Sequence, residues 1–144
     1  MPRVSTVDIV TAVLARLESG REYPYNKTKL NLGFKRADEQ LPQLFPYGIT
    51  FGVAGGLIDS DAVDYAMGTL GLSNLVEYIF SRQTAIRFTS ALRVDAEEHL
   101  FGKLDKAGIP REVLDRAAAI VEEALRMPDS EVPMEEVLNL SRSS

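Results

Sequence analysis

Prolines and glycines are concentrated in one segment of this 144-residue chain, and the segment separates two regions with helical patterns. From residue 20 to residue 58 the sequence has three of its seven prolines and six of its ten glycines, so no long helix is expected across this part. A chain of this length is expected to fold as one domain with a sizeable core. We therefore predict a single domain over residues 1–144, with an N-terminal helix over 1–20, a connector over 21–58, a helical region over 59–140 and a frayed tail over 141–144.

The first helix is predicted from a capping pattern followed by a regular apolar stripe. Ser5 can cap the helix, and Asp8 follows three residues later, as in a capping box. Gly20 can end the helical segment in a left-handed conformation. The apolar residues recur at helical spacing and are expected to face a core: Val10, Val13, Leu14 and Leu17.

The connector shows signs of short strands. Leu30, Leu32 and Phe34 alternate with more polar or small residues, as in a half-buried strand over 28–34. The stretch YGITFGVAGGLI, residues 47–58, has four glycines among β-branched and aromatic residues, which favours a strand entering a tight turn. We expect residues 28–58 to form either a small β-hairpin, with these two stretches paired, or an irregular layer.

The remainder is predicted to be helical, giving a mainly α fold: a compact bundle of five to six helices. One helix should run from Ser60 or Asp61 to about Leu70, with Gly71 as its break. A longer helix, apolar on more than one face, is expected over 74–93 and could serve as an interface. Further helices are predicted up to residue 106, either as a new helix from Asp95 or as a continuation, then over 110–126, and finally from Pro133, with a docking stripe of Met134, Val137 and Leu138.

Composition limits the function classes. The chain has no Cys, which excludes thiol catalysis, disulfides and thiolate metal sites. The N-terminus lacks the order of a signal peptide, and the longest apolar run, Gly48 to Ile58, is too short to span a bilayer. We therefore expect a cytoplasmic protein without membrane contact. The net charge of −5 is uneven: residues 1–55 have seven Lys or Arg against five Asp or Glu, and residues 56–144 have nine against sixteen.

A segment over 61–82 is similar to a helix-turn-helix. Leu70, Gly71, Leu72 and Ser73 follow the pattern of its turn, in which a helix ends at Gly and Ser caps the next helix. The start of the second helix would have Glu77 and no positive charge, which is unfavourable on a polyanion. A nucleic-acid-binding regulator is therefore an alternative function, and nucleic acid ranks below a protein as the expected partner.

The stretch GGLIDSDAVD, residues 55–64, supplies a second alternative. Asp59-x-Asp61-x-Val63 after an apolar run resembles the nucleophile motif of haloacid-dehalogenase-like phosphotransferases. The resemblance covers five positions and implies a Mg²⁺-dependent phosphoryl transfer in which Asp59 attacks phosphorus and Asp61 acts as acid or base. The helical pattern that follows lacks the alternating strands of such an enzyme, and the simpler interpretation is two acids favoured at a helix N-terminus.

The only histidine, His99, lies four residues after Asp95, and we interpret the two as a surface ion pair. No set of residues suggests a nucleophile with its base or a complete metal site. We therefore predict no catalytic residues, no metal and no cofactor, and the chain is expected not to be an enzyme.

The basic stretch REYPYNKTKLNLGFKR, residues 21–36, is interpreted as a connector. If it contains a strand, Lys29, Asn31 and Lys35 share one face, opposite the apolar face. The lysines then form a modest basic edge, expected to contact an acidic patch of a protein, or the chain's own acidic C-terminal half, before a nucleic acid.

These observations predict a small non-enzymatic protein-binding module: an adaptor, an inhibitor or an assembly subunit. It would act through an apolar helix face and its acidic C-terminal half. The partner is expected to be a protein, and self-association into a homo-oligomer is a further expectation. The predicted partner-binding residues are Leu75, Tyr78, Ile79, Arg82, Lys29 and Lys35.

Overall fold

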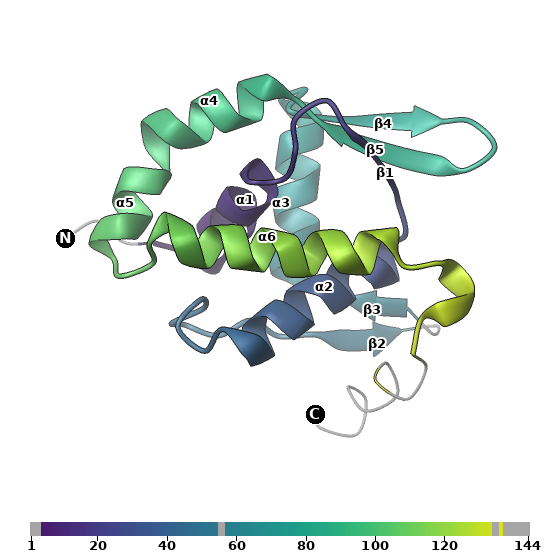
Figure 1. Ribbon diagram of the computed structural model, residues 1–144, viewed down its shortest axis with the longest axis horizontal. Coiled ribbons are helices and arrows are strands. Elements are labelled where there is room, and N and C mark those ends of the chain that lie inside the picture. The colour runs from purple at the N-terminus through teal and green to yellow at the C-terminus, as the bar shows by residue number, and fades with distance from the viewer. Residues whose placement is uncertain (1–3, 55–56, 134–135, 137–144) are drawn as a thin grey trace.

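The computed structural model describes residues 4–54, 57–133 and 136, and shows a mainly α protein with two small antiparallel sheets (Figure 1). One sheet has the strand order β1-β5-β4, and the other pairs β2 with β3. In chain order the elements are α1 (Thr6–Ala15), β1 (Glu22–Pro24), α2 (Lys27–Gln40), β2 (Gly52–Ala54), β3 (Leu57–Asp59), α3 (Asp61–Leu72), β4 (Val76–Phe80), β5 (Thr84–Phe88), α4 (Ser90–His99), α5 (Phe101–Lys106), α6 (Arg111–Arg126) and the short 3₁₀ helix η1 (Asp129–Glu131).

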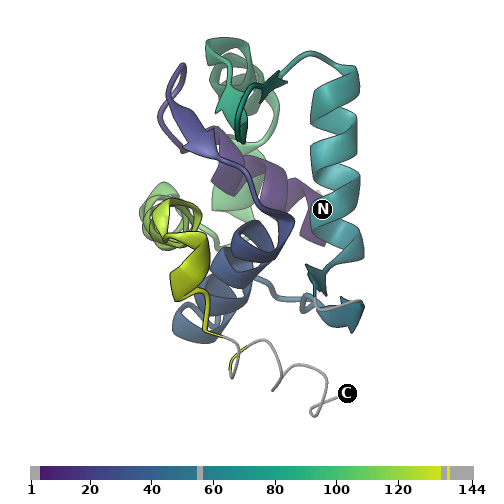
Figure 2. The same ribbon diagram turned by 90° about the vertical axis from the view of Figure 1, so that its right-hand side faces the viewer.

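The first helix, α1, lies in the middle of the molecule and confirms the predicted cap. The Ser5 hydroxyl accepts a hydrogen bond from the Asp8 amide, and the Asp8 carboxylate accepts one from the Ser5 amide. Gly20 has a φ of 80°, as expected for the left-handed end of this segment. Figure 2 shows α1 between α3 and α6, and it packs on both. All four residues of the predicted stripe are buried: Val10, Val13, Leu14 and Leu17.

The predicted strand over 28–34 is wrong, because these residues form the first half of helix α2. Asn26 caps the helix by accepting hydrogen bonds from the amides of Thr28 and Lys29. All seven residues from Thr28 to Phe34 are buried, since α6 packs on one side of the helix and β3 on another. A helix buried all round lacks a polar face, so its apolar residues can also match a strand pattern.

Helices α2 and α6 approach each other closely at a glycine. A Cβ atom added to Gly33 would lie 2.9 Å from the Cα of Val121 and 3.2 Å from the Cβ of Ala124. The predicted helix over 110–126 is confirmed as α6, which begins after Pro110. On the apolar side of α6, Val113, Ala117, Val121 and Ala124 are buried, and Ile120 is partly buried.

The predicted long helix over 74–93 is also wrong. Helix α3 continues through Gly71 to Leu72, and the chain then reverses at Asn74, which has a φ of 59°. The Leu75 amide donates to the Leu70 carbonyl, as in a helix end with a left-handed residue. Residues 76–80 and 84–88 then form the antiparallel pair β4 and β5, whose β-branched and aromatic residues favour strands. The second helix of the helix-turn-helix-like segment is therefore strand β4.

Residues 52–54 and 57–59 pair with each other, and neither strand pairs with residues 28–34. Strand β2 pairs with β3, in the register Val53 opposite Ile58. Ile58 is buried and packs with Leu32 of α2 in a small second core. The hairpin thus covers the side of α2 that faces away from the main core.

In the described residues, the last part of the chain contains the α-helices α4, α5 and α6 and the short 3₁₀ helix η1. Thr89 caps α4, so this helix begins five residues earlier than the predicted start at Asp95, and α5 follows as a separate helix. Gly108, with a φ of 88°, ends this region as expected. Met134, Val137 and Leu138 of the predicted last helix, and the predicted frayed tail, lie outside the described residues. No helix of the described chain combines the length and apolar character needed to cross a membrane.

Candidate functional site

The β4–β5 hairpin has an apolar face that packs on the core. Residues opposite each other in an antiparallel pair point to the same side of the sheet, so Tyr78 shares a face with Ile86, and Val76 with Phe88. Ile86 and Phe88 are buried in the main core. Phe80, two residues beyond Tyr78 on the same strand, belongs to this face as well.

The apolar face continues beyond the core into solvent. Along β4 the exposed fraction rises from 3% at Val76 to 36% at Tyr78 and 80% at Phe80. Figure 1 shows the reason: the end of the β4–β5 hairpin projects past the helices, so nothing in the described chain covers its last residues. The structure therefore places a large aromatic side chain where it gains no burial from the fold.

Three aromatic rings, which we call the aromatic row, lie side by side here: Tyr25, Tyr78 and Phe80. The Tyr25 and Tyr78 ring centroids are 5.7 Å apart in an edge-to-face arrangement, and those of Tyr78 and Phe80 are 6.4 Å apart and nearly parallel. The Tyr25 amide donates to the Thr84 carbonyl, which fixes Tyr25 beside the sheet. Burial raises the pKa of both tyrosines, so the hydroxyls stay protonated at neutral pH.

The outer face of α3 adjoins the aromatic row. A Cβ atom on Gly71 would lie 3.6 Å from Cε2 of Tyr78, so the helix and the hairpin touch at this point. Tyr65 and Leu72, two turns apart on the outer face, are 67% and 89% exposed. Two neighbouring elements thus expose large apolar side chains in the same region of the molecule.

A cluster of one cation and two carboxylates lies beside Tyr25. The Lys27 ammonium is 3.1 Å from an Asp59 oxygen and 3.2 Å from an Asp64 oxygen. Hydrogen bonds from the Asp64 carboxyl and from Lys27 lower the pKa of Asp59. Burial and the neighbouring Asp59 raise the pKa of Asp64, while the two carboxylates raise the pKa of Lys27. The cluster ties β3 and α3 to the start of α2.

Most cations near the aromatic row are neutralised within the chain. On the charged face of the sheet, Arg87 is paired with Glu77 at 3.2 Å and with Glu22 at 3.9 Å. Lys27 is shared between two carboxylates, as described above. Arg82, in the turn between β4 and β5, is exposed and has no ion pair within the described residues. The region therefore has little net positive charge to offer a polyanion.

The structure divides the six predicted partner-binding residues between two places. Four of them lie on the β4–β5 hairpin or just before it: Leu75, Tyr78, Ile79 and Arg82. Tyr78 is in the aromatic row, and Ile79 points to the charged face of the sheet. Leu75 packs partly on the core. Lys29 and Lys35 lie on α2. The sequence patterns did not indicate Tyr25 as part of the aromatic row, nor Tyr65, Leu72 and Phe80 as exposed side chains, although the alternation of Val76, Tyr78 and Phe80 could have indicated a strand.

Lys29 is buried and bonded to other parts of the chain. Its side chain is 3% exposed, and its ammonium donates to the Met127 carbonyl at 2.8 Å and pairs with Asp129 at 2.9 Å. These contacts hold the chain after α6 against α2, at one side of a hollow of about 590 Å³. The buried lysine is therefore not available to a partner.

The acidic C-terminal half neutralises much of the basic N-terminal third. Lys35 approaches Glu136, and Arg36 lies 3.2 Å from the same carboxylate. Of the contacts expected for the basic stretch, the structure thus shows those with the chain's own acidic half. Two further ion pairs join separate elements of the described chain, Arg16 with Asp115 and Arg111 with Glu97, and Arg126 pairs with Glu122 within α6.

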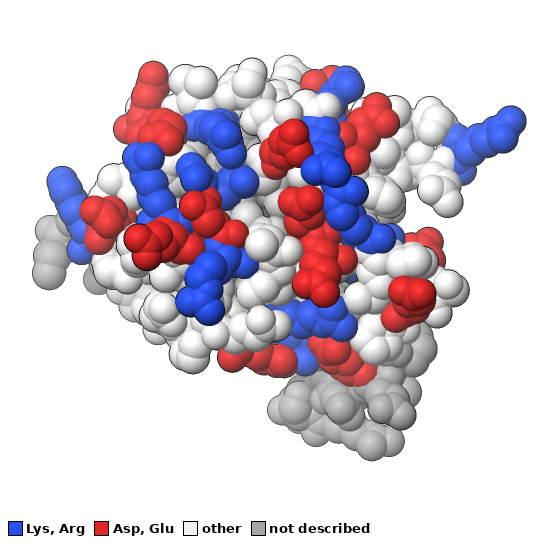
Figure 3. Space-filling view, viewed as in Figure 1, with Lys and Arg blue, Asp and Glu red and all other residues white. Residues whose placement is uncertain are grey.

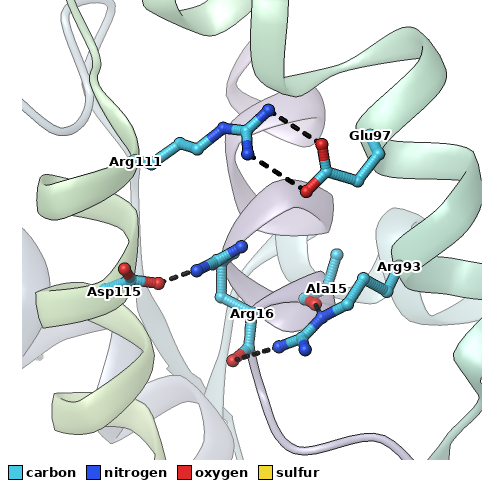
Figure 4. A network of polar contacts seen from close by, with 6 residues as sticks. All are labelled: Ala15, Arg16, Arg93, Glu97, Arg111 and Asp115. Carbon is cyan, nitrogen blue, oxygen red and sulfur yellow. Dashed lines mark hydrogen bonds and ion pairs between the residues drawn. The ribbon is translucent and has the colours of Figure 1, made fainter.

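The arginines between α1, α4 and α6 are likewise part of the fold (Figure 4). Arg16 and Arg111 each lie over the Phe101 ring, at 5.4 and 5.3 Å from its centroid. Arg93 reaches the carbonyls of Ala15 and Arg16 at the end of α1. Positive and negative side chains alternate over this face in Figure 3 and do not form a patch of one sign.

The residues considered for chemistry are not brought together as a site. The Asp59 carboxylate is engaged by Lys27, whereas Asp61 is exposed in the first turn of α3. His99 is exposed beside Asp95 and Glu98, at 3.9 and 3.7 Å. No group of three or more His, Cys, Asp or Glu side chains suited to a metal ion exists in the described part of the chain.

Comparisons of the chain with protein-family models, with curated proteins and with solved structures find no match in any of the three.

Proposed function

We propose that this protein is a small non-enzymatic protein-binding module, an adaptor, inhibitor or assembly subunit, that binds its partner through the aromatic row and the outer face of α3. The observation that carries the proposal is the 80% exposure of Phe80 on the strand face that elsewhere forms the core. A partner that covers this end of the hairpin would continue the apolar packing already present below it.

The chemistry of the surface favours a protein over a polyanion. Exposed Tyr and Phe side chains are typical of interface centres, where they bury a large area at little cost in side-chain entropy. Helix α3 has Asp61 and Asp64 in its first turn and no Lys or Arg. We therefore propose a protein partner with an apolar patch that covers the aromatic row.

Affinity capture from the native host tests the proposal. The bait is the purified protein, compared with Phe80→Asp and with Val94→Asp, which places the same charge on an exposed position of α4. Wild-type protein and Val94→Asp should retain the same partner, and Phe80→Asp should lose it. Equal capture by all three proteins, or no capture by any, would contradict the proposed surface.

The connectivity of the fold favours nucleic-acid binding as a second candidate function. Apart from the inserted strands β2 and β3, the order α1, β1, α2, α3, β4, β5, with β1 beside β5, matches winged helix-turn-helix modules, in which a helix equivalent to α3 enters the major groove. In this chain residues 41–60, which contain β2 and β3, separate α2 from α3, and the first turn of α3 is acidic. Connectivity alone does not define a function, so this candidate ranks second.

A titration of fluorescent duplex DNA at low salt decides the second candidate. DNA binding would appear as a rise in anisotropy that weakens with added salt, because phosphate contacts release counterions. Arg82→Ala should then reduce the affinity. Absence of binding at about 10 µM protein would remove nucleic acid from consideration, because non-specific affinities at low salt are stronger than this.

A further inference from the structure

Strand β4 forms an open edge of its sheet. Among the described residues its one strand neighbour, in the order β1-β5-β4, is β5, and helix α3 also packs on it (Figure 1). In the described chain its outward backbone groups have no backbone partner. The strand has no Pro or Lys, the residues that often protect edges from pairing with another chain.

The hydrogen-bond pattern identifies the outward groups. The Thr89 amide donates to the Leu75 carbonyl, which makes this a bonded pair of the β4–β5 ladder. Bonded and non-bonded pairs alternate in an antiparallel ladder. The amides and carbonyls of Glu77 and Ile79 therefore point to β5, and those of Val76, Tyr78 and Phe80 point to the open edge.

This edge is complementary to itself. If two copies of β4 pair antiparallel with Tyr78 opposite Tyr78, then Val76 of each copy lies opposite Phe80 of the other. In this register every outward backbone amide of one copy meets an outward carbonyl of the other copy. The exposed Phe80 of one copy then lies beside Val76 of the other copy and near the end of that copy's α3, where Leu72 is 89% exposed. The same register brings the turn that contains Arg82 to the level of Asn74 of the other copy.

The charges agree with this register. Helix α3 has no basic residue in its last turn, and a helix C-terminus has a partial negative charge. Arg82 has no ion pair within the described residues and would approach that end of α3 in the second copy. On the opposite side of the sheet, Glu77 would face Ile79, so no like charges meet directly.

We propose that the partner seated on the open edge of β4 is a second copy of this chain, joined through a two-fold axis at Tyr78 into one continuous sheet. This inference rests on the proposed function, since it assigns an occupant to the same surface. A five-residue strand pair buries less area than the ~1,200 Å² of a stable interface, so the dissociation constant should be about 10 to 100 µM.

Sedimentation equilibrium between about 1 and 500 µM measures this association directly. The average mass should rise from 15.9 kDa toward twice that value. Tyr78→Pro removes an outward amide without breaking the β4–β5 ladder and should stay monomeric, whereas Tyr78→Ala keeps the amide and should weaken the dimer less. Circular dichroism should show the same fold for both variants.

A cysteine cross-link tests the register, because the chain has no Cys of its own. Opposite Cα atoms in a bonded pair are about 5.5 Å apart, within the range of a disulfide. Under mild oxidation Tyr78→Cys should form covalent dimers at least about ten times faster than Val94→Cys, an exposed control on α4.

Two results would overturn the inference: a monomer at every concentration with equal cross-linking of the two Cys variants, or a dimer that Tyr78→Pro leaves unchanged. If the monomer still captures a different protein and Phe80→Asp abolishes that capture, the proposed function stands and only self-association fails. If the protein captures no partner, or if capture does not depend on Phe80, both the proposed function and the self-association fail.

Discussion

Gly33 of α2 lies directly against Val121 of α6: a Cβ atom on Gly33 would be 2.9 Å from the Val121 Cα. Because the contact is with a backbone atom, the neighbouring helix would have to move to accommodate a side chain. The close approach of these two helices therefore depends on the absence of a side chain at position 33.

Gly33→Ala should destabilise the protein, even though Ala favours helix more than Gly. Overpacking costs about 1–3 kcal/mol and exceeds a propensity gain of about 1 kcal/mol. Gly68→Ala in α3 is the matched control, since its Cβ would meet nothing within 4 Å, and it should stabilise the protein by about 0.5–1 kcal/mol. Urea denaturation measures the free energy of unfolding of both variants. An equal increase for Gly33→Ala and Gly68→Ala would disprove the close approach of α2 and α6.

Substitutions of Asn74 test the chain reversal between α3 and β4. Its φ of 59° is tolerated by Asn and Gly but disfavoured for other residues. Asn74→Gly should leave the free energy of unfolding nearly unchanged, and Asn74→Ala should lower it by about 1 kcal/mol. If residue 74 lay inside a helix, Ala would instead be more stable than Gly.

The strand predicted over 28–34 and the helix predicted over 74–93 are wrong for the same reason: the spacing of their apolar residues fits the other type of element. Residues 28–34 are buried all round in a helix and match the period of a strand, whereas Leu75 and Ile79 match the period of a helix but belong to a hairpin segment. The turn at Ser81 to Gln83 lacks Gly, Pro and Asn, so no turn residue indicates a hairpin. Helices α1 and α6 were predictable because each has apolar residues at helical spacing and a clear start signal, the Ser5 cap for α1 and Pro110 for α6.

The candidate site was only partly predictable. Tyr78 and Arg82 are on the hairpin that the structure exposes, but Phe80 looks like a core residue in any apolar pattern. Lys29 and Lys35 look available in the sequence, and their partners Asp129 and Glu136 are about 100 residues further along the chain. Long-range ion pairs have no local sequence signal, so the roles of these lysines required the structure.

Lys29→Met should destabilise the fold more than Lys35→Met. Removing the Lys29 ammonium leaves the Met127 carbonyl without its donor, which costs about 1–3 kcal/mol. Lys35 pairs with Glu39, which is more than half exposed, and such surface pairs contribute about 0–1 kcal/mol. Chemical denaturation compares the two variants; equal free energies of unfolding would show that Lys29 does not hold the chain after α6.

Asp59 and Asp64 should have opposite effects on stability. The pKa of Asp59 is lowered in the folded protein, so its charge stabilises the fold at neutral pH, and this stability is lost as pH falls through the lowered pKa. The pKa of Asp64 is raised, so its charge opposes folding at neutral pH, and this penalty disappears as the pH falls below the ordinary carboxyl range.

At pH 7 Asp59→Asn should therefore lower the melting temperature and Asp64→Asn should raise it slightly. The Asp64→Asn difference should disappear once the pH is below the ordinary carboxyl range, and the Asp59→Asn difference should disappear only as the pH falls through the lowered pKa of Asp59. Thermal unfolding monitored at several pH values measures them. Equal shifts of the same sign at pH 7 would contradict the arrangement around Lys27.

The most direct test of the binding surface is the dissociation constant for a captured partner, measured by calorimetry with wild-type protein, Phe80→Asp and Val94→Asp. A buried aromatic residue at an interface contributes about 2 kcal/mol or more, so Phe80→Asp should weaken binding by at least about thirtyfold. Val94→Asp should bind like wild type. An unchanged dissociation constant for a correctly folded Phe80→Asp would contradict the account.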